Sequence, residues 1–311
     1  MVFVIPSQTE GKKLEKEDRH KALGIEADTR MIIKELKSLF SIKRAKKIFN
    51  TLEKKAGKTD VLGPEEIEKA FGIKLEQKNI PLIPFSKEEL ELANELGQFL
   101  ILRVNVDDQD PPQPLTMKGL GDMMTRQGYS EITRRVIENH SSENWWTSDN
   151  IELRWALVSK DLIKGSSSGN IYKKTSLLKN EITEIFKDEE MPLKYQEAIK
   201  EFDDYIRNRF NDLTNDEITD VIGGLAREQY NKEFSKLKLN DLLRKTPAEE
   251  LYDELAYFQI NEERLTERVC NQTKRVGSDG NLVALGYFGD AVLVSGGGRI
   301  PKVVGIFLSR S

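Results

Sequence analysis

The amino-acid composition changes abruptly near the C-terminus, and this change limits what the chain can fold into. Residues 275–301 contain no Lys, Glu, Gln, Met or Trp, although charged residues make up 32% of the whole chain. Gly, Val and Leu dominate instead, and short apolar runs between glycines are typical of strands joined by tight turns. We predict turns at Gly280 and at residues 296–298. The strands are expected at 267–274, 282–288, 291–295 and 303–309.

Most of the chain before this tail has apolar residues at the three- and four-residue spacing that is typical of helices. A long helix is expected from about residue 28 to residue 57, and a short one between Pro64 and Gly72. Ser86, with Glu89 three residues later, predicts the capped start of a further helix. Other helices are expected at 176–189, 193–211, 214–236 and 247–266, with two short ones within 115–135.

Two apolar segments in the middle of the chain, Gln98–Val106 and Leu153–Ser159, predict strands. Helices, a mixed region, more helices and a β tail indicate an α+β fold in which strands distant in sequence pair. A length of 311 residues, of which 38% are hydrophobic, suggests either two domains or one core domain with a helical elaboration. The expected parts are an N-terminal helical segment (1–75) and a mixed domain (76–311), with a helical insertion at 176–264 and a C-terminal β segment at 265–311.

Charge and rare residues restrict the classes of function. There are 48 Lys and Arg against 52 Asp and Glu, so the net charge of −4 does not favour nucleic acid. The lone Cys270 excludes internal disulfides and cysteine-based metal sites, and we expect it to be buried. Because no acid–base pair, nucleophile or ligand set emerges, we predict no catalytic residue, no metal and no cofactor. Without a long apolar run or a signal peptide, the protein is expected to be soluble, cytoplasmic or virion-associated, with no membrane insertion.

Several short motifs have both a functional and a structural interpretation, and we favour the structural one each time. The glycines at 296–298 lack the Lys-Ser/Thr of a phosphate-binding loop. The cluster from Asp107 to Asp110 lacks the Gly and the closing Glu of a calcium loop. His140 and the serines after it lack a third catalytic member. The three tryptophans are expected to pack in the core rather than stack on a carbohydrate, and the basic residues 43–47 to form a solvated helix face.

The five residue types missing from the tail share one property. Codons that end in C cannot encode Lys, Glu, Gln, Met or Trp. A segment diversified from asparagine codons by random replacement of the two adenines would lack these five types. It could still contain Phe, Gly, Asp, Ala, Val, Leu, Ser, Arg, Ile and Pro, which are the ten types found in residues 288–301. A strand-rich tail is the alternative explanation, because strands also disfavour Lys and Glu.

The tail from Asp279 to Ser311 (DGNLVALGYFGDAVLVSGGGRIPKVVGIFLSRS) resembles the end of a C-type lectin-fold domain. It is most similar to the variable proteins of diversity-generating retroelements. In that family, a reverse transcriptase copies a template with adenine-specific errors into the 3′ end of the gene. Residues 304–308 resemble the fixed core strand that ends such domains. The resemblance implies a C-type lectin-like mixed module, here with an N-terminal helical segment and a large helical insertion.

The same resemblance implies a non-enzymatic protein that binds a macromolecular ligand, most simply another protein, through its C-terminal strands. The lone Cys270 argues against the paired-cysteine chemistry of the related formylglycine-generating enzymes. Residues between the buried ones would face solvent and could vary at little cost to folding. The residues expected to be buried are Val283, Leu285, Val303, Ile306 and Leu308. The predicted ligand-binding residues are Tyr287, Asp290, Val292, Val294, Ser295, Arg299 and Pro301.

Two other classes of function stay open. The chain could be a structural or assembly protein of a virus or mobile element, and its tail would then have ordinary codons and no variation among sister genes. It could also bind nucleic acid through its basic N-terminal helices, although the net charge argues against this. Binding to nucleic acid would show a strong dependence on salt, which distinguishes it from the other two classes.

Overall fold

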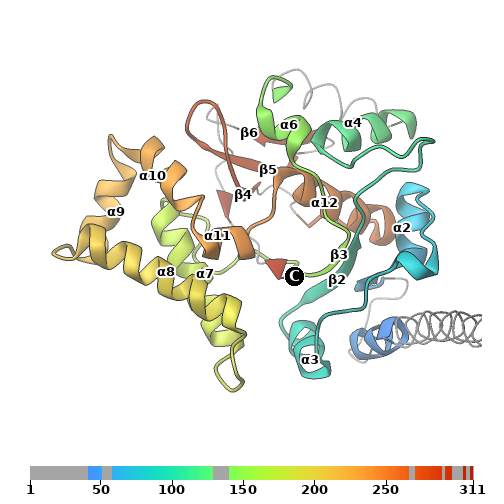
Figure 1. The fold of residues 1–311 in the computed structure, drawn as a ribbon, viewed down its shortest axis with the longest axis horizontal. Coiled ribbons are helices and arrows are strands. Elements are labelled where there is room, and N and C mark those ends of the chain that lie inside the picture. Colours follow the sequence, from blue (N-terminus) through green and yellow to red (C-terminus); the bar gives the residue numbers. More distant parts are fainter. Residues whose placement is uncertain are drawn as a thin grey trace, which may run out of the picture.

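The computed structural model describes residues 41–50, 58–128, 140–265, 270–288, 291–295, 304–305 and 309–310. Within these residues, a region of helices and strands is followed by a run of helices and then by strands. The fold is α+β, as expected, and strands distant in sequence pair with one another. Figure 1 shows a lobe of helices on one side and a body that contains a sheet on the other.

The first sheet contains both strands that were expected in the middle of the chain. β2 (Gln98–Arg103) pairs antiparallel with β3 (Arg154–Ser159). β1 (Val61–Leu62) runs parallel to β2, and β8 (Ser309–Arg310) pairs antiparallel with β3. Every residue of β2 is buried, which explains why its sequence is a nearly continuous apolar run rather than an alternation. The sheet thus joins both ends of the described chain to its middle.

Two helices beside this sheet begin where their capping signals predict. Pro64 occupies the first turn of its helix, and Gly72 ends it with a left-handed φ of 74°. Ser86 and Glu89 form the expected capping box. A 3-10 turn also lies at Gln77–Asn79. The helices of this body are α2 (Pro64–Phe71), α3 (Lys87–Glu95), α4 (Met117–Arg126), α6 (Asn144–Ser148) and α12 (Pro247–Asn261).

Helix α12 lies at the centre of the molecule. It contacts α2, α4 and β2 as well as strands near the C-terminus, and all residues from 247 to 257 are buried. The expected helical insertion (176–264) includes this helix, but Leu251, Tyr252 and Leu255 belong to the hydrophobic cluster of the body. The three tryptophans are buried in the same cluster, so the prediction that they pack in the core is confirmed.

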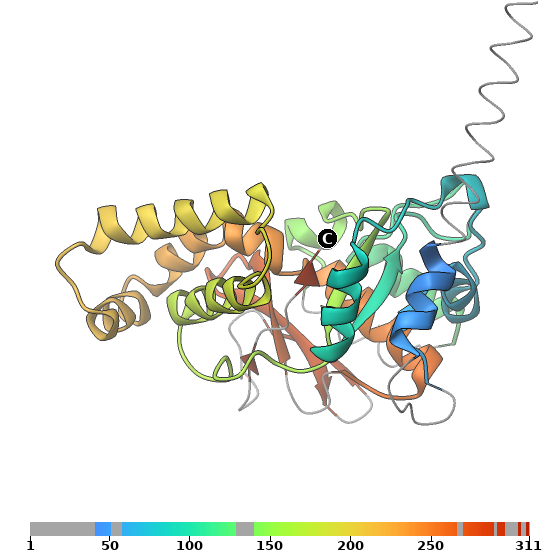
Figure 2. The same cartoon turned by 90° about the horizontal axis from the view of Figure 1, so that it is seen from below.

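The lobe consists of five helices around a second hydrophobic cluster, and Figure 2 shows it beside the body. The helix expected at 214–236 is wrong as one element, because Gly223 and Gly224 interrupt it. Glycine weakens a helix interior and suits its end. The first helix of the lobe starts earlier than expected, after an Asn170 cap. The helices are α7 (Ile171–Ile185), α8 (Leu193–Phe210), α9 (Asn215–Gly223), α10 (Arg227–Phe234) and α11 (Lys238–Leu243).

The C-terminal strands form a second sheet in the order β6-β5-β4-β7. Its strands are β4 (Cys270–Val276), β5 (Leu282–Phe288), β6 (Ala291–Ser295) and β7 (Val304–Gly305), and the predicted bounds of β5 and β6 are confirmed. The single strand expected at 303–309 is wrong, because β7 runs parallel to β4 while β8 joins the first sheet. The predicted turn at Gly280 is confirmed by a φ of 74°, and an added Cβ would approach Glu228 within 2.7 Å.

Candidate functional site

The residues predicted to bind a ligand lie on β5, on β6 and in segments next to them. Tyr287 lies on β5, and Val292, Val294 and Ser295 lie on β6. Among the described strands, β6 is the edge of its sheet. These four positions therefore lie on or beside one sheet edge. The remaining predicted residues, which lie outside the described part of the chain, are Asp290, Arg299 and Pro301.

The pairing of β5 with β6 is regular, with Leu285 opposite Val294 and Ala284 opposite Ser295. Paired residues of antiparallel strands belong to the same face of a sheet, whereas consecutive residues belong to opposite faces. Val294 and Ser295 therefore belong to opposite faces, so the predicted contact residues are not confined to one side of the sheet. Their role in binding stays a prediction.

Both hydrophobic clusters hold β5 in place. Val283 and Leu285 belong to the cluster of the body and are 0% and 1% exposed, which confirms that they are buried. Leu282 belongs to the cluster of the lobe. Because both faces of β5 are packed, a shift of register would expose apolar side chains. The other residues expected in this core, which lie outside the described residues, are Val303, Ile306 and Leu308.

Strand β4 is joined to the rest of the protein by buried polar contacts. The Asn271 side-chain amide donates to the Glu250 carboxylate of α12 over 2.6 Å. The Thr273 hydroxyl donates to a carbonyl oxygen of β5 over 2.9 Å. The backbone N–H of Lys274 donates to the carbonyl oxygen of Lys245, at 3.0 Å. Because a buried polar group that loses its partner is costly, the Asn271–Glu250 contact holds β4 against α12, and the contact with Lys245 holds β4 against the segment before that helix.

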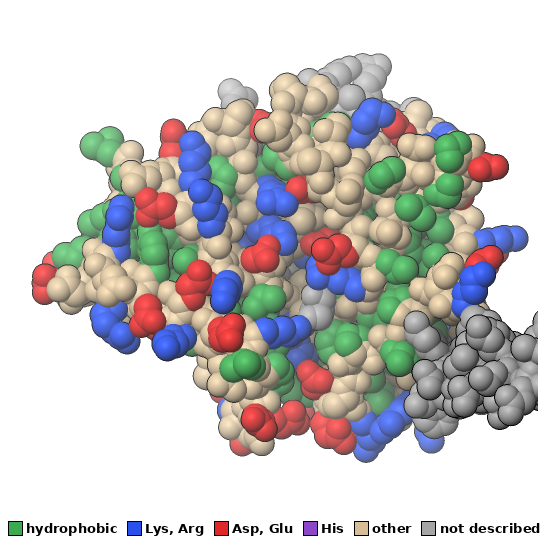
Figure 3. Space-filling view, in the orientation of Figure 1, with side chains coloured by type: hydrophobic (Ala, Val, Ile, Leu, Met, Phe, Trp, Pro, Cys, Tyr) green, Lys and Arg blue, Asp and Glu red, His purple; other side chains and the backbone are tan. Residues whose placement is uncertain are grey.

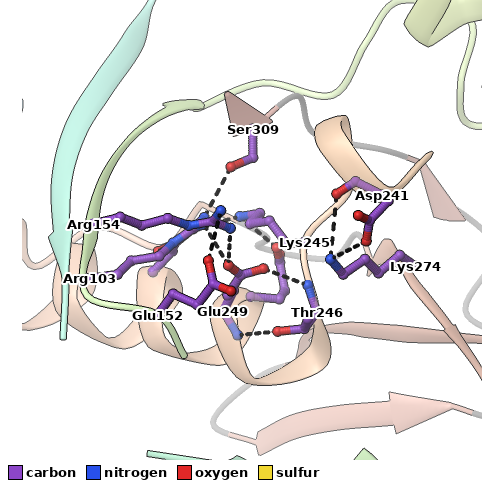
Figure 4. A network of polar contacts seen from close by, with 11 residues as sticks. Arg103, Glu152, Arg154, Asp241, Lys245, Thr246, Glu249, Lys274 and Ser309 are labelled. Carbon is purple, nitrogen blue, oxygen red and sulfur yellow. Dashed lines mark hydrogen bonds and ion pairs between the residues drawn. The ribbon is translucent and has the colours of Figure 1, made fainter. Parts of the chain in front are cut away.

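A buried network of charges links α12 to the first sheet, as Figure 4 shows. Arg103 of β2 donates from Nε and Nη2 to the two carboxylate oxygens of Asp253, at 3.0 and 2.7 Å. Its Nη1 donates to Glu249 at 3.0 Å, and its Nη2 also donates to Ser309 of β8 at 3.1 Å. The arginine is 1% exposed. Such a forked contact with a carboxylate is among the strongest polar interactions in proteins.

Two further cations complete the network. Lys245 lies 2.6 Å from Glu250 and 3.2 Å from Asp253, measured from Nζ to the nearest carboxylate oxygens. Nη2 of Arg154 lies 2.6 Å from the Glu249 carboxylate. Together with the arginine of β2, three cations face three carboxylates. The network therefore meets the main condition for burying charge, which is that every charge has a partner.

The pKa shifts of Arg103 and Glu249 keep these two groups ionised. Burial alone would lower the pKa of Arg103, but the carboxylates of Asp253 and Glu249 outweigh burial and raise it. Burial would raise the pKa of Glu249, but Arg103 and Arg154 outweigh it and lower this pKa to about 2. Acid–base catalysis needs a group that titrates near the working pH. The arrangement is therefore suited to holding α12 and β2 together rather than to transferring protons.

Sequence reasoning missed this network, although the sequence contains a signal for it. Arg103 interrupts an otherwise apolar strand, and a cation at such a position is buried with the strand. Glu249 and Asp253 lie four residues apart in α12, so they share one face of the helix. A buried cation needs a partner of opposite charge, and carboxylates on one helix face can provide it. This combination in the sequence predicts an ion pair between the strand and the helix.

The helical lobe contains buried cations in a different setting. Arg244 is 4% exposed, and its Nε donates to the Asn240 side-chain oxygen over 2.6 Å. Within the described structure, its Nη1 and Nη2 make no hydrogen bond. Burial lowers the pKa of Arg244 to about 9. Lys174 is 3% exposed, and burial together with the charges of Arg244 and Arg227 lowers its pKa to about 7.

The stability of the protein is expected to rise between pH 7 and pH 9. The folded chain releases the proton of Lys174 near pH 7, whereas the unfolded chain keeps it up to about 10.5. Between these values the unfolded state binds more protons, so the free energy of unfolding increases with pH by up to about 1.4 kcal/mol per unit. Chemical denaturation at several pH values measures this slope.

The matched control for this prediction is Lys174→Met, which keeps an unbranched side chain and removes the titrating group. The variant should lack this part of the slope and should be more stable than the parent at pH 7. A slope of the same size in both proteins would contradict the assignment to Lys174.

Two of the other motifs singled out in the sequence are accounted for by local structure, and the glycines at 296–298 lie outside the described residues. Asp107 is 6% exposed, and its carboxylate accepts hydrogen bonds from the backbone N–H groups of Gln109 and Gln113 and from Arg126. Cys270 is buried, as predicted. No group of three or more His, Cys, Asp or Glu side chains that could hold a metal ion is found in the described part of the chain.

The surface drawn in Figure 3 mixes Lys and Arg with Asp and Glu, and no single sign dominates that face. None of the described helices is long and apolar enough to cross a membrane.

Comparisons with known proteins add no further information. No family model, curated protein or solved structure matches the chain. The resemblance of the tail to retroelement variable proteins therefore stays a prediction from the sequence.

Proposed function

We propose that this chain is a non-enzymatic binding protein that contacts a macromolecular ligand, most simply a protein, through the β5–β6 hairpin and the segments next to it. The observation that carries the proposal is the contrast between the two strands. β5 is packed against both hydrophobic clusters, whereas β6 is the edge of the sheet among the described strands. A rigid base beside an edge strand suits recognition by exchangeable side chains.

Contacts from the helical lobe to the turn between β4 and β5 also support the proposal. The Asn231 side-chain amide donates to the Gly280 carbonyl oxygen over 3.1 Å, and Arg227 donates to the Asn281 side chain over 2.6 Å. The polar contacts of β4 with α12 hold the opposite side. Strands β4 and β5 are therefore held by contacts that do not involve β6. Substitutions in β6 should leave these contacts in place.

We further propose that the module is C-type lectin-like and that a retroelement diversifies its C-terminal segment. The composition of residues 275–301 and the resemblance of the tail support this part of the proposal. Sequencing the gene and its flanks tests it directly. A near-copy of the tail that differs almost only at adenines, with a reverse-transcriptase gene nearby, is the expected result. Ordinary codons and no copy would instead favour a structural or assembly protein without a diversified site.

A pool randomised at the seven predicted contact positions is expected to remain folded in most members. We propose that the side chains at these positions face solvent, and substitutions of exposed residues usually change the free energy of unfolding by less than about 0.5 kcal/mol. Resistance of displayed pool members to protease measures the folded fraction, and selection on immobilised proteins then tests for binding. The randomised positions are Tyr287, Asp290, Val292, Val294, Ser295, Arg299 and Pro301.

A control pool of equal size should lose most of its folded members, because large-to-small changes in a core cost about 2 to 5 kcal/mol. If both pools unfold to the same extent, the proposed surface is part of the core and the proposal fails. The control positions, all buried, are Cys270, Asn271, Thr273, Leu282, Val283, Ala284 and Leu285.

A further inference from the structure

A groove lies where the end of α10, helix α11 and strand β4 meet. Its volume is about 550 Å³. Three separate elements contribute cations to it, and the described lining contains one carboxylate and no aromatic side chain. The cations in the lining are Lys232, Lys236, Lys238, Lys274 and Arg275, and the carboxylate is Asp241.

Carboxylates neutralise part of this positive charge. Lys274 Nζ lies 2.8 Å from Asp241, and Arg275 Nε lies 2.6 Å from Asp149. The contact of Lys238 with a neighbouring glutamate is long, at 3.5 Å, and both side chains are more than half exposed. An exposed pair of this kind contributes little energy and can separate when another anion approaches.

Two lysines of the groove are not neutralised by an ion pair within the described structure, so they can contact an anionic ligand. Lys232 and Lys236 are exposed and form no ion pair with any residue that the structure describes. The charge of Lys236 helps to lower the pKa of Glu233, and this carboxylate already accepts hydrogen bonds from Tyr205 and Gln229. Lysines in the last turn of a helix are common because they suit its dipole. The dipole of α10 does not explain, however, why α11 and β4 bring further cations to the same place.

We propose that this groove binds the phosphate groups of an oligophosphate ligand. Ammonium and guanidinium groups from several directions can satisfy the many acceptor oxygens of linked phosphates. The absence of aromatic side chains in the described lining removes the usual means of stacking on a base. The groove therefore recognises the phosphates rather than a base. This inference is independent of the function proposed for the β5–β6 hairpin.

Calorimetric titration of the full chain with inorganic tripolyphosphate tests the proposal. At about 50 mM salt, where screening is weak, saturable binding is expected. The double variant Lys232→Ala/Lys236→Ala should weaken binding at least about tenfold, because each lysine donates a charge-assisted hydrogen bond. A second double variant, Lys232→Glu/Lys236→Glu, reverses the charge at both positions and should abolish the binding of tripolyphosphate. Thermal unfolding of each variant checks that the fold is retained.

The matched control is Lys74→Ala/Lys78→Ala, which removes the same charge from two exposed lysines outside the groove. It should change the affinity less than about twofold, because exposed charges beyond the Debye length are screened. No binding of tripolyphosphate, or an equal loss in both double variants, would overturn the proposal. A single-stranded oligonucleotide that competes with tripolyphosphate, and loses binding in the groove variant, would identify a phosphodiester chain as the source of the phosphates.

Discussion

Replacing Arg103 by Met is expected to lower the free energy of unfolding by about 3 to 5 kcal/mol. The substitution leaves Glu249 and Asp253 buried without the cation that contacts both of them. Asp253 is 0% exposed, so water cannot take the place of the guanidinium. Urea denaturation at neutral pH, followed by circular dichroism, measures the loss.

The control for this prediction is Arg154→Met. Arg154 contacts the same Glu249 carboxylate, but its side chain is 33% exposed, and Glu249 would keep its contact with Arg103. An exposed partner of this kind should cost about 1 kcal/mol or less. If both variants lost the same stability, or if the Arg103 variant lost less than the control, the charged network would not be the link between α12 and the first sheet.

The sequence predicts the elements of this fold well where the signal is local. A strand shows a period of two and a helix a period of about three and a half, and capping residues such as Ser86 act within one turn. The bounds of β5 and β6 follow from apolar runs between glycines. The break between α9 and α10 also has a local cause, but the pattern of apolar residues continues through Gly223 and Gly224 and hides it.

Pairings between distant segments could not be predicted in the same way. Arg103 and Asp253 are 150 residues apart, and nothing near either residue identifies the other. The acidic residues of α12 look like a solvated face when the helix is read alone. Only the structure, in which residues 247–257 are all buried, shows that the acidic residues of α12 face Arg103 of β2 and Lys245. For the same reason, the sequence assigns α12 to the lobe, although its apolar residues belong to the body.

The candidate site could be predicted from the sequence only in part. That residues 282–288 and 291–295 form strands follows from local sequence, and the buried positions Val283 and Leu285 follow from alternation. Which residues share a face depends on the register with the neighbouring strand. The structure pairs Leu285 with Val294, which separates Val294 from Ser295. An alternating pattern alone can be shifted by one residue without any local penalty, so it does not decide which side meets a ligand.

The same substitution at Arg244 is expected to have the opposite effect from that at Arg103. Arg244→Met should raise the free energy of unfolding by about 1 to 4 kcal/mol, because an unbranched apolar side chain replaces a buried cation. The variant loses one hydrogen bond, from Nε to Asn240. The Asn240 oxygen keeps only a 3.2 Å contact with the Thr175 hydroxyl, whose single proton also lies 2.7 Å from the Ile171 carbonyl oxygen, measured between heavy atoms. The weakened contact at Asn240 therefore offsets part of the gain.

Arg103→Met and Arg244→Met make the same chemical change at two buried positions. Comparing them separates the effect of ion pairing on stability from the effect of burying a cation. Arg103 is 1% exposed and Arg244 is 4% exposed, so removal of apolar contact area is closely matched between them. They differ in that Arg103 contacts two carboxylates, whereas the Nη atoms of Arg244 have no hydrogen-bond partner in the described structure. Equal losses in the two variants would mean that packing of the arginine stem decides stability at both positions. Opposite signs, measured in the same urea titration, would mean that a buried cation stabilises this fold only where α12 supplies its counter-charge.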